Sequence, residues 1–103
     1  MVKNSLVIGA DYQFGRELAT SLMNESNTIG VGFKDTIQAP FPYSACFSAF
    51  DLESIIREYD ISNVFLVLYT DIDCYEQFEK ETVYKAAYMC GAKVITIYTN
   101  SMR

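Results

Sequence analysis

The segment from Leu6 to Leu18, LVIGADYQFGREL, constrains the fold of this chain more than any other. It begins with a short apolar run, which is typical of a strand covered on both faces. Gly9 follows at once and predicts a tight turn. Phe14 and Leu18 then recur at helical spacing. The segment therefore predicts a strand, a glycine turn and a helix in direct succession, which is the first unit of an α/β fold.

Five apolar runs along the chain predict five strands. They cover residues 6–8, 28–33, 43–50, 63–69 and 93–98. Pro40 and Pro42 exclude a helix between the second and third runs. Predicted helices separate the other strands, so right-handed crossovers should join them into a parallel sheet of order 3-2-1-4-5. We expect a doubly wound, Rossmann-like α/β/α sandwich that occupies residues 1–103 as one domain.

Three stretches with helical periodicity predict three helices. The first covers 14–25. Asp51 is a good N-cap for the second. Asp73 and Glu76 have the spacing of a capping box and open the third, which Gly91 ends as a left-handed C′ residue.

The composition argues against several classes of function. The formal charge is −5 and no basic cluster is present, so we expect neither nucleic acid nor an anionic membrane as a partner. The longest apolar runs are about five residues, far short of the roughly 20 that a membrane span needs. The amino terminus lacks the apolar centre of a signal peptide, so a cytoplasmic location is expected.

No metal site is predicted. Histidine is absent, which removes the commonest metal ligand and the commonest general base. Cys46, Cys74 and Cys90 are an odd number without C-x-x-C spacing, so neither a zinc site nor a disulfide framework is indicated. Acidic residues between Asp71 and Glu81 favour a stabilised helix start over ligation of Mg²⁺ or Ca²⁺.

Four segments in register resemble the cofactor-binding half of dTDP-4-dehydrorhamnose reductase, an extended short-chain dehydrogenase. Residues 9–18 are similar to that family's G-A-x-G-Q-L-G-R-E-L, and Phe50-Asp51-Leu52 is similar to its Asp-Leu/Ile pair after the third strand. Residues 69–73 resemble A-Y-T-x-V-D, and residues 91–100 resemble G-A-x-L-V-x-I-S-T-D. The resemblance covers nearly the whole chain.

The resemblance implies an NAD(P) site at the carboxyl edge of the sheet. Its residues would be Gly9, Ala10, Tyr12, Gln13, Phe14, Gly15, Lys34, Asp51 and Leu52. In the family, a basic residue at the position of Lys34 meets the 2′-phosphate of NADP, and the Asp51 pair contacts adenine. The residues by themselves favour a solvated lysine beside Asp35 and a helix N-cap at Asp51.

Two residues in the turn depart from the family's pattern. Tyr12 replaces the middle glycine, which normally lets the backbone approach the pyrophosphate. Asp11 adds a negative charge where the phosphates should sit. Large side chains at 65–68 would also fill the crevice. These departures predict a narrowed cleft and no resident cofactor; the alternative is a Tyr12 ring folded outward over an intact turn that still takes NAD(P).

No catalytic residue is assigned. The family's chemistry uses a hydroxyl residue together with the tyrosine and lysine of a Y-x-x-x-K motif. Thr99 matches the hydroxyl position, but no Y-x-x-x-K occurs in the 103 residues, and the sugar-binding half is absent from them. We therefore do not expect this chain alone to act as a conventional reductase.

Three functional hypotheses follow from the sequence. The first is a non-catalytic, reduced Rossmann-like protein that acts through protein contacts as a regulator or assembly factor. The second is a nucleotide- or NAD(P)-binding module, such as a sensor. The third is an enzyme component that another chain completes. A bare fifth strand at 93–98 predicts a homodimer or a dedicated protein partner, and Phe41 and Tyr59 are candidates for exposed interface aromatics.

Overall fold

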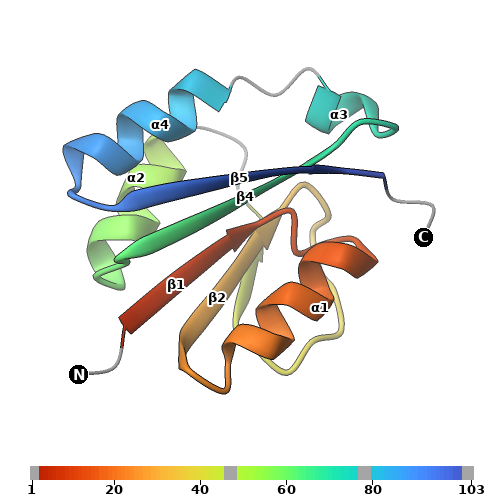
Figure 1. Ribbon diagram of the computed structural model, residues 1–103, viewed down its shortest axis with the longest axis horizontal. Coiled ribbons are helices and arrows are strands. Elements are labelled where there is room, and N and C mark those ends of the chain that lie inside the picture. Colours follow the sequence, from red (N-terminus) through yellow and green to blue (C-terminus); the bar gives the residue numbers. More distant parts are fainter. Residues whose placement is uncertain (1–2, 46–48, 77–79, 101–103) are drawn as a thin grey trace.

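The computed structural model describes residues 3–45, 49–76 and 80–100, which form one parallel sheet between two layers of helices (Figure 1). The strands are β1 (Lys3–Ile8), β2 (Ser26–Gly32), β3 (Tyr43–Ala45), β4 (Asn63–Tyr69) and β5 (Lys93–Thr99). All neighbouring strands pair in parallel, in the order β3-β2-β1-β4-β5. This confirms the predicted Rossmann-like topology.

The helices cover the two faces of the sheet. Helix α1 (Gln13–Leu22) lies on one face, and α2 (Ala49–Glu58) and α4 (Lys80–Met89) lie together on the other (Figure 1). The short helix α3 (Asp73–Glu76) follows the carboxyl end of β4. The fold is thus a doubly wound, three-layer α/β/α sandwich, as predicted.

The core lies around the two central strands. Leu6 pairs with Val64 in the register of β1 and β4, and both side chains are fully buried. Both strands are covered on both faces, which explains why their sequences are continuously apolar rather than alternating. Helix α2 adds Leu52 and Ile56 to the core, and α4 adds Val83 with its neighbouring alanines.

The predicted third strand and second helix have different boundaries in the structure. Strand β3 ends at Ala45 rather than at residue 50, and α2 already begins at Ala49. Asp51 therefore lies within the first turn of α2 and is not its N-cap, which corrects the prediction. Its acidic charge still suits the positive end of the helix dipole. The error arose because a short apolar run is compatible with both a strand and the start of a helix.

The predicted third helix corresponds to two described helices, α3 and α4, and Phe78 lies outside the described residues. The prediction for its end is confirmed. Gly91 has φ 75°, its amide donates to Tyr88, and the Ala92 amide donates to the Ala87 carbonyl at 2.8 Å. These two bonds form a Schellman motif.

The two edges of the sheet differ in the protection that the sequence gives them. Strand β3 has three residues and follows Pro42, whose carbonyl accepts the Gly30 amide. Phe41 beside it is buried in the core, so the predicted exposure of Phe41 was wrong. Strand β5 has seven residues and contains neither proline nor glycine.

Among the described residues, no helix is long and apolar enough to cross a membrane.

Candidate functional site

The glycine turn between β1 and α1 has the predicted strand–turn–helix geometry. Gly9 has φ 100°, a left-handed conformation that favours glycine, and its amide donates to the Val31 carbonyl at 2.9 Å. Tyr12 precedes α1 in an extended conformation and makes no side-chain cap. Gly15 lies in the first turn of α1, where a Cβ would collide with the Gly9 carbonyl. Both glycines are therefore needed for this close packing.

A tyrosine at the end of β4 fills the space between the two glycines. Tyr69 is fully buried; its hydroxyl donates to the Gly9 carbonyl at 2.6 Å and accepts from the Gly15 amide at 2.8 Å. In dinucleotide-binding domains, the amides at the start of this helix face the pyrophosphate. Here Tyr69 already binds one of them. Sequence reasoning had placed the obstruction at residues 65–68, one position too early.

The carboxylate of Asp11 is also fully buried, and three donors bind it. Its Oδ2 accepts the amides of Phe33 at 2.9 Å and Lys34 at 3.3 Å, and its Oδ1 accepts the hydroxyl of Tyr75 at 2.6 Å. Gly32 makes room for it, since a Cβ there would collide with the carboxyl carbon. These bonds compensate for the hydration that the carboxylate loses on burial.

This position corrects the role predicted for Asp11. The carboxylate does not point into the glycine turn to repel phosphates. It lies against the backbone that follows β2. A Rossmann-like domain holds the ribose of its ligand at this strand end. The Asp11 carboxylate therefore lies at the end of β2 rather than inside the glycine turn.

Four aromatic rings pack over the turn and the buried carboxylate; we call Tyr12, Phe33, Tyr69 and Tyr75 the aromatic plug. The rings of Tyr69 and Tyr75 have centroids 5.2 Å apart at 74°, and Phe33 meets Tyr75 at 4.9 Å and 78°. Tyr12 lies 5.1 Å from Tyr69. These are the tilted and edge-to-face geometries that aromatic pairs prefer. The Tyr12 ring is thus folded over the crevice rather than outward, above an intact turn.

Two hydroxyls of the plug, those of Tyr69 and Tyr75, have raised pKa values. Burial raises the pKa of Tyr69 to about 12, and the charge of Asp11 adds to this effect. Burial, followed by the charge of Asp11, also raises the pKa of Tyr75 well above its usual range. At neutral pH both hydroxyls are therefore protonated donors, held on the Gly9 carbonyl and on Asp11.

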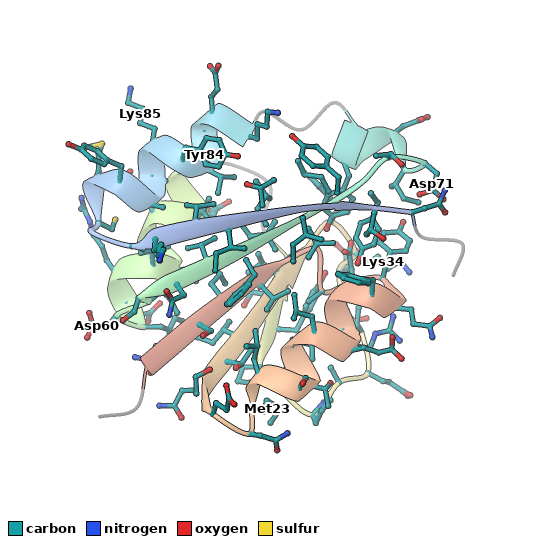
Figure 2. The ribbon with its side chains drawn as sticks, viewed as in Figure 1. Met23, Lys34, Asp60, Asp71, Tyr84 and Lys85 are labelled. Atoms are coloured by element: carbon teal, nitrogen blue, oxygen red, sulfur yellow. The ribbon has the colours of Figure 1, made fainter. Side chains whose placement is uncertain are left out.

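Two cationic side chains contact residues of the glycine turn. The Lys34 ammonium lies 4.2 Å from the centroid of the Tyr12 ring, in a cation–π contact (Figure 2 shows Lys34 beside the start of α1). Arg16 donates through one terminal nitrogen to the Asp11 carbonyl at 3.3 Å. Its Nε is buried and has no hydrogen-bond partner within the described residues.

The remaining residues of the predicted cofactor site separate into open and buried positions. Ala10 is fully buried beside the turn, and Phe14 packs against the core from α1. Gln13 is exposed at the first position of α1. Leu52 is buried in the core, which leaves its side chain little surface for an adenine contact, and Asp51 beside it is exposed.

Thr99, at the position of the family's hydroxyl residue, is the last residue of β5 and pairs with Tyr69 of the plug. Its carbonyl accepts the Thr70 amide at 2.9 Å and the Thr70 hydroxyl at 3.3 Å.

In the part of the chain that the structure describes, no three Cys, Asp or Glu side chains gather closely enough to hold a metal ion.

Sequence reasoning missed three residues of this region: Tyr69, Tyr75 and Arg16. Each of these residues lay in a sequence segment that was interpreted in another way. Tyr69 lay within a segment matched to the family's A-Y-T, Tyr75 within a helix start, and Arg16 within the family's G-R-E-L. These residues come together only because β4 pairs with β1. For example, the hydrogen bond between Gly15 and Tyr69 joins residues that are 54 positions apart in the chain.

Comparison with known proteins supports the fold. No protein-family model matches the sequence, and no curated protein sequence matches it. Solved structures do resemble the chain. A monomeric L-threonine 3-dehydrogenase from a metagenome superposes with a TM-score of 0.73 at 21% identity, over 87% of this chain and 34% of the other.

Two further structures were solved with the dinucleotide bound. Uronate dehydrogenase from Agrobacterium tumefaciens, complexed with NAD, has a TM-score of 0.69 at 15% identity over 93% of this chain and 40% of the other. WbmH from Bordetella bronchiseptica, complexed with NAD⁺, has a TM-score of 0.68 at 16% identity over 89% of this chain and 37% of the other. The chain thus spans between a third and a half of these proteins, and at such identities the likeness concerns the fold.

Proposed function

We propose that this protein is a non-catalytic, Rossmann-like module that acts through protein contacts, and that its own side chains close its dinucleotide crevice. The observation that carries the proposal is the buried hydrogen bond from Tyr75 to Asp11, with the Tyr75 ring packed edge-to-face against Tyr69. A dinucleotide in the pose usual for this fold would have to displace these groups. Displacing Tyr75 would leave a buried carboxylate without one of its three donors, which is costly.

Three further observations support the closed crevice. The hydroxyl of Tyr69 accepts a hydrogen bond from the Gly15 amide, so this amide cannot donate to a phosphate. The Tyr12 side chain stands where the family has a glycine and packs onto Tyr69. Leu52, the family's adenine contact, is buried in the core. The plug thus obstructs the positions of pyrophosphate and ribose together.

A second candidate function is a nucleotide-binding module, and one observation favours it. The buried Nε of Arg16 has no hydrogen-bond partner in the described part of the chain, and Lys34 stands nearby on the ring of Tyr12. Both cations suit the phosphate of a ligand that binds at the mouth of the crevice, outside the plug. No such observation favours the third hypothesis, an enzyme component completed by another chain.

Calorimetric titration of the purified protein with NADPH, NADH and a dTDP-sugar tests the proposal. We expect no binding tighter than about 1 mM, because Asp11 and the plug obstruct the usual pose. A variant that removes two obstructions, Tyr12→Gly with Tyr75→Ala, should bind NADPH or NADH measurably more tightly.

The result that would favour the second candidate is wild-type binding tighter than about 100 μM. Lys34→Ala should then weaken NADPH more than NADH, since only NADPH carries the 2′-phosphate. Lys85→Ala, a change of the same chemistry on α4, is the matched control and should have no effect (Figure 2).

A further inference from the structure

We propose that β5 is a self-association edge, through which two copies of this chain pair antiparallel about a two-fold axis at Thr96 and form one continuous ten-stranded sheet. This inference names the partner of the proposed function above and rests on it.

The backbone of β5 offers a complete set of hydrogen-bonding groups on its outer side. The Lys93 amide and the Thr99 carbonyl both point inward, to Ser62 and Thr70. Successive residues of a strand point their amide and carbonyl to opposite sides. Val94, Thr96 and Tyr98 therefore direct theirs away from β4; we call these three residues the outer set.

One antiparallel register uses every group of the outer set. With the two-fold axis at Thr96, this residue pairs with itself across the interface, and Val94 of each copy pairs with Tyr98 of the other. Each pair exchanges two hydrogen bonds. A register centred on Val94 or on Tyr98 would leave groups of the outer set unpaired. Strand β5 is thus self-complementary about Thr96.

The side chains around β5 fit the same register. Tyr84, Lys85 and Tyr88 of α4 and Ala92, Val94 and Thr96 of the β5 region line a groove. Tyr98 of the second copy, as the cross-strand neighbour of Val94, would enter this groove. An aromatic residue opposite a β-branched one is a favourable cross-strand pair. On the other face of the sheet, Ile95 would meet Ile97 of the second copy.

Exposed apolar surface is concentrated at this edge. Seven large hydrophobic side chains are exposed among the described residues, and five of them lie on α4 and β5. They are Tyr84, Tyr88, Met89, Ile95 and Tyr98. Tyr88, at 85%, is the most exposed of them. Exposed apolar side chains on both faces of an edge strand favour an interaction surface over an ordinary solvated edge.

The charges at the two ends of β5 are complementary under the two-fold axis. Lys93 begins the strand, and Asp71 lies beside its far end, immediately after the residue that binds the Thr99 carbonyl (Figure 2). Antiparallel pairing brings Lys93 of one copy opposite Thr99 of the other, and so close to the second copy's Asp71. A parallel arrangement would instead place like charges together.

Cysteine cross-linking tests the register. In a hydrogen-bonded antiparallel pair the Cα atoms lie about 5.5 Å apart, within reach of a disulfide. Thr96→Cys should therefore give a covalent dimer on mild oxidation. In Val94→Cys the two new cysteines would be about 13 Å apart, so this matched control should not cross-link. The wild type, treated identically, corrects for the native cysteines.

Sedimentation velocity tests the association itself. The wild type should sediment as a dimer of 11.7 kDa chains at tens of micromolar. Thr96→Pro removes an outward amide while keeping the ladder to β4, and should weaken dimerisation about 100-fold, the effect of two lost hydrogen bonds at the axis. Tyr98→Ala should also weaken it, whereas Tyr59→Ala, which changes another exposed tyrosine outside α4 and β5, should not.

Tyr98→Ala keeps the inference testable even if Thr96→Pro does not fold. A monomeric wild type at 1 mM overturns the inference, and so does equal cross-linking of the Thr96→Cys and Val94→Cys variants. The failures of the two proposals are distinguishable. A monomer that gives no heat with NAD(P)H overturns the dimer alone, and a dimer that binds NADPH overturns the closed crevice alone.

Discussion

Asp11 connects three parts of the chain because a buried carboxylate needs several donors. Two of these donors are amides that follow β2, and the third is the hydroxyl of Tyr75 on α3. Each bond involves a charged acceptor and is therefore stronger than a bond between neutral groups. The same residue thus positions α3 over the crevice and stabilises the chain after β2.

Gly32→Ala tests this arrangement, because the new Cβ would collide with the Asp11 carboxyl group. We expect a loss of about 2–4 kcal/mol in the free energy of unfolding, measured by urea denaturation. In an Asp11→Ala background the same change should cost at least about 1 kcal/mol less, since the colliding group is gone. Equal losses in both backgrounds would contradict the geometry.

The plug tyrosines predict a pH dependence of stability. The pKa of Tyr69 is about 12 in the folded protein and about 10 in the unfolded chain. Above pH 10 the unfolded state therefore binds fewer protons, so the free energy of unfolding falls as the pH rises from about 10 towards 12. Urea midpoints at pH 8, 9, 10 and 11 measure this fall.

Tyr69→Phe should make this alkaline loss of stability shallower, because one of the buried hydroxyls that resist ionisation is removed. Tyr75→Phe should act in the same direction. Tyr59→Phe, outside the plug, is the control and should keep the wild-type slope. A slope that is the same in all four proteins would mean that the plug hydroxyls are not buried as described.

At the scale of elements, two helices end in the same motif with different residues. Gly91 is the left-handed C′ residue that follows α4, and Asp60, which has φ 51°, is the one that follows α2. The Ile61 amide donates to the Ile56 carbonyl at 2.9 Å, as the Ala92 amide does in the other motif. Glycine adopts this left-handed conformation without strain, whereas aspartate pays a steric penalty.

Opposite substitutions at these two positions should therefore change stability in opposite directions. Asp60→Gly should raise the free energy of unfolding by about 0.5–1 kcal/mol. Gly91→Ala should lower it by about 1 kcal/mol, purely through backbone strain, since a Cβ there would contact nothing. Chemical denaturation of the two variants beside the wild type measures both changes; a loss on Asp60→Gly would contradict the assignment.

At the scale of the whole molecule, the two edge strands of the sheet differ in length and composition within the described residues. Strand β3 is short and flanked by Pro42, which discourages further pairing. Strand β5 is long and regular, and its neighbour α4 exposes Tyr88 and Met89. Under the proposed pairing of β5, the assembly closes at a dimer, because β3 is a poor edge for further pairing.

Dimerisation also predicts that thermal stability depends on protein concentration. A partner that binds only the folded chain raises its apparent stability by mass action. The melting temperature of the wild type should rise between about 5 and 500 μM, while that of Tyr98→Ala should rise less. Differential scanning calorimetry measures both, and a wild-type melting temperature independent of concentration would contradict self-association.

The sequence by itself determined the order of the elements, the topology of the sheet and the positions of its sharpest turns. Apolar runs identified β1 and β4, helical spacing identified α1, and Gly9 and Gly91 marked turns, because each of these signals is local. Boundaries were less certain where a short apolar run fits two periods, as at the start of α2.

Only the tertiary structure decided what the crevice contains and which residues of β5 point away from β4. Asp11 in the turn and Tyr75 on α3 are 64 residues apart, and no spacing rule relates them. Their contact depends on how the chain after β4 lies over the ends of β1 and β2. The outward direction of Val94, Thr96 and Tyr98 likewise depends on the register of β5 with β4. Periodicity predicts elements, whereas long-range packing places the side chains that meet between them.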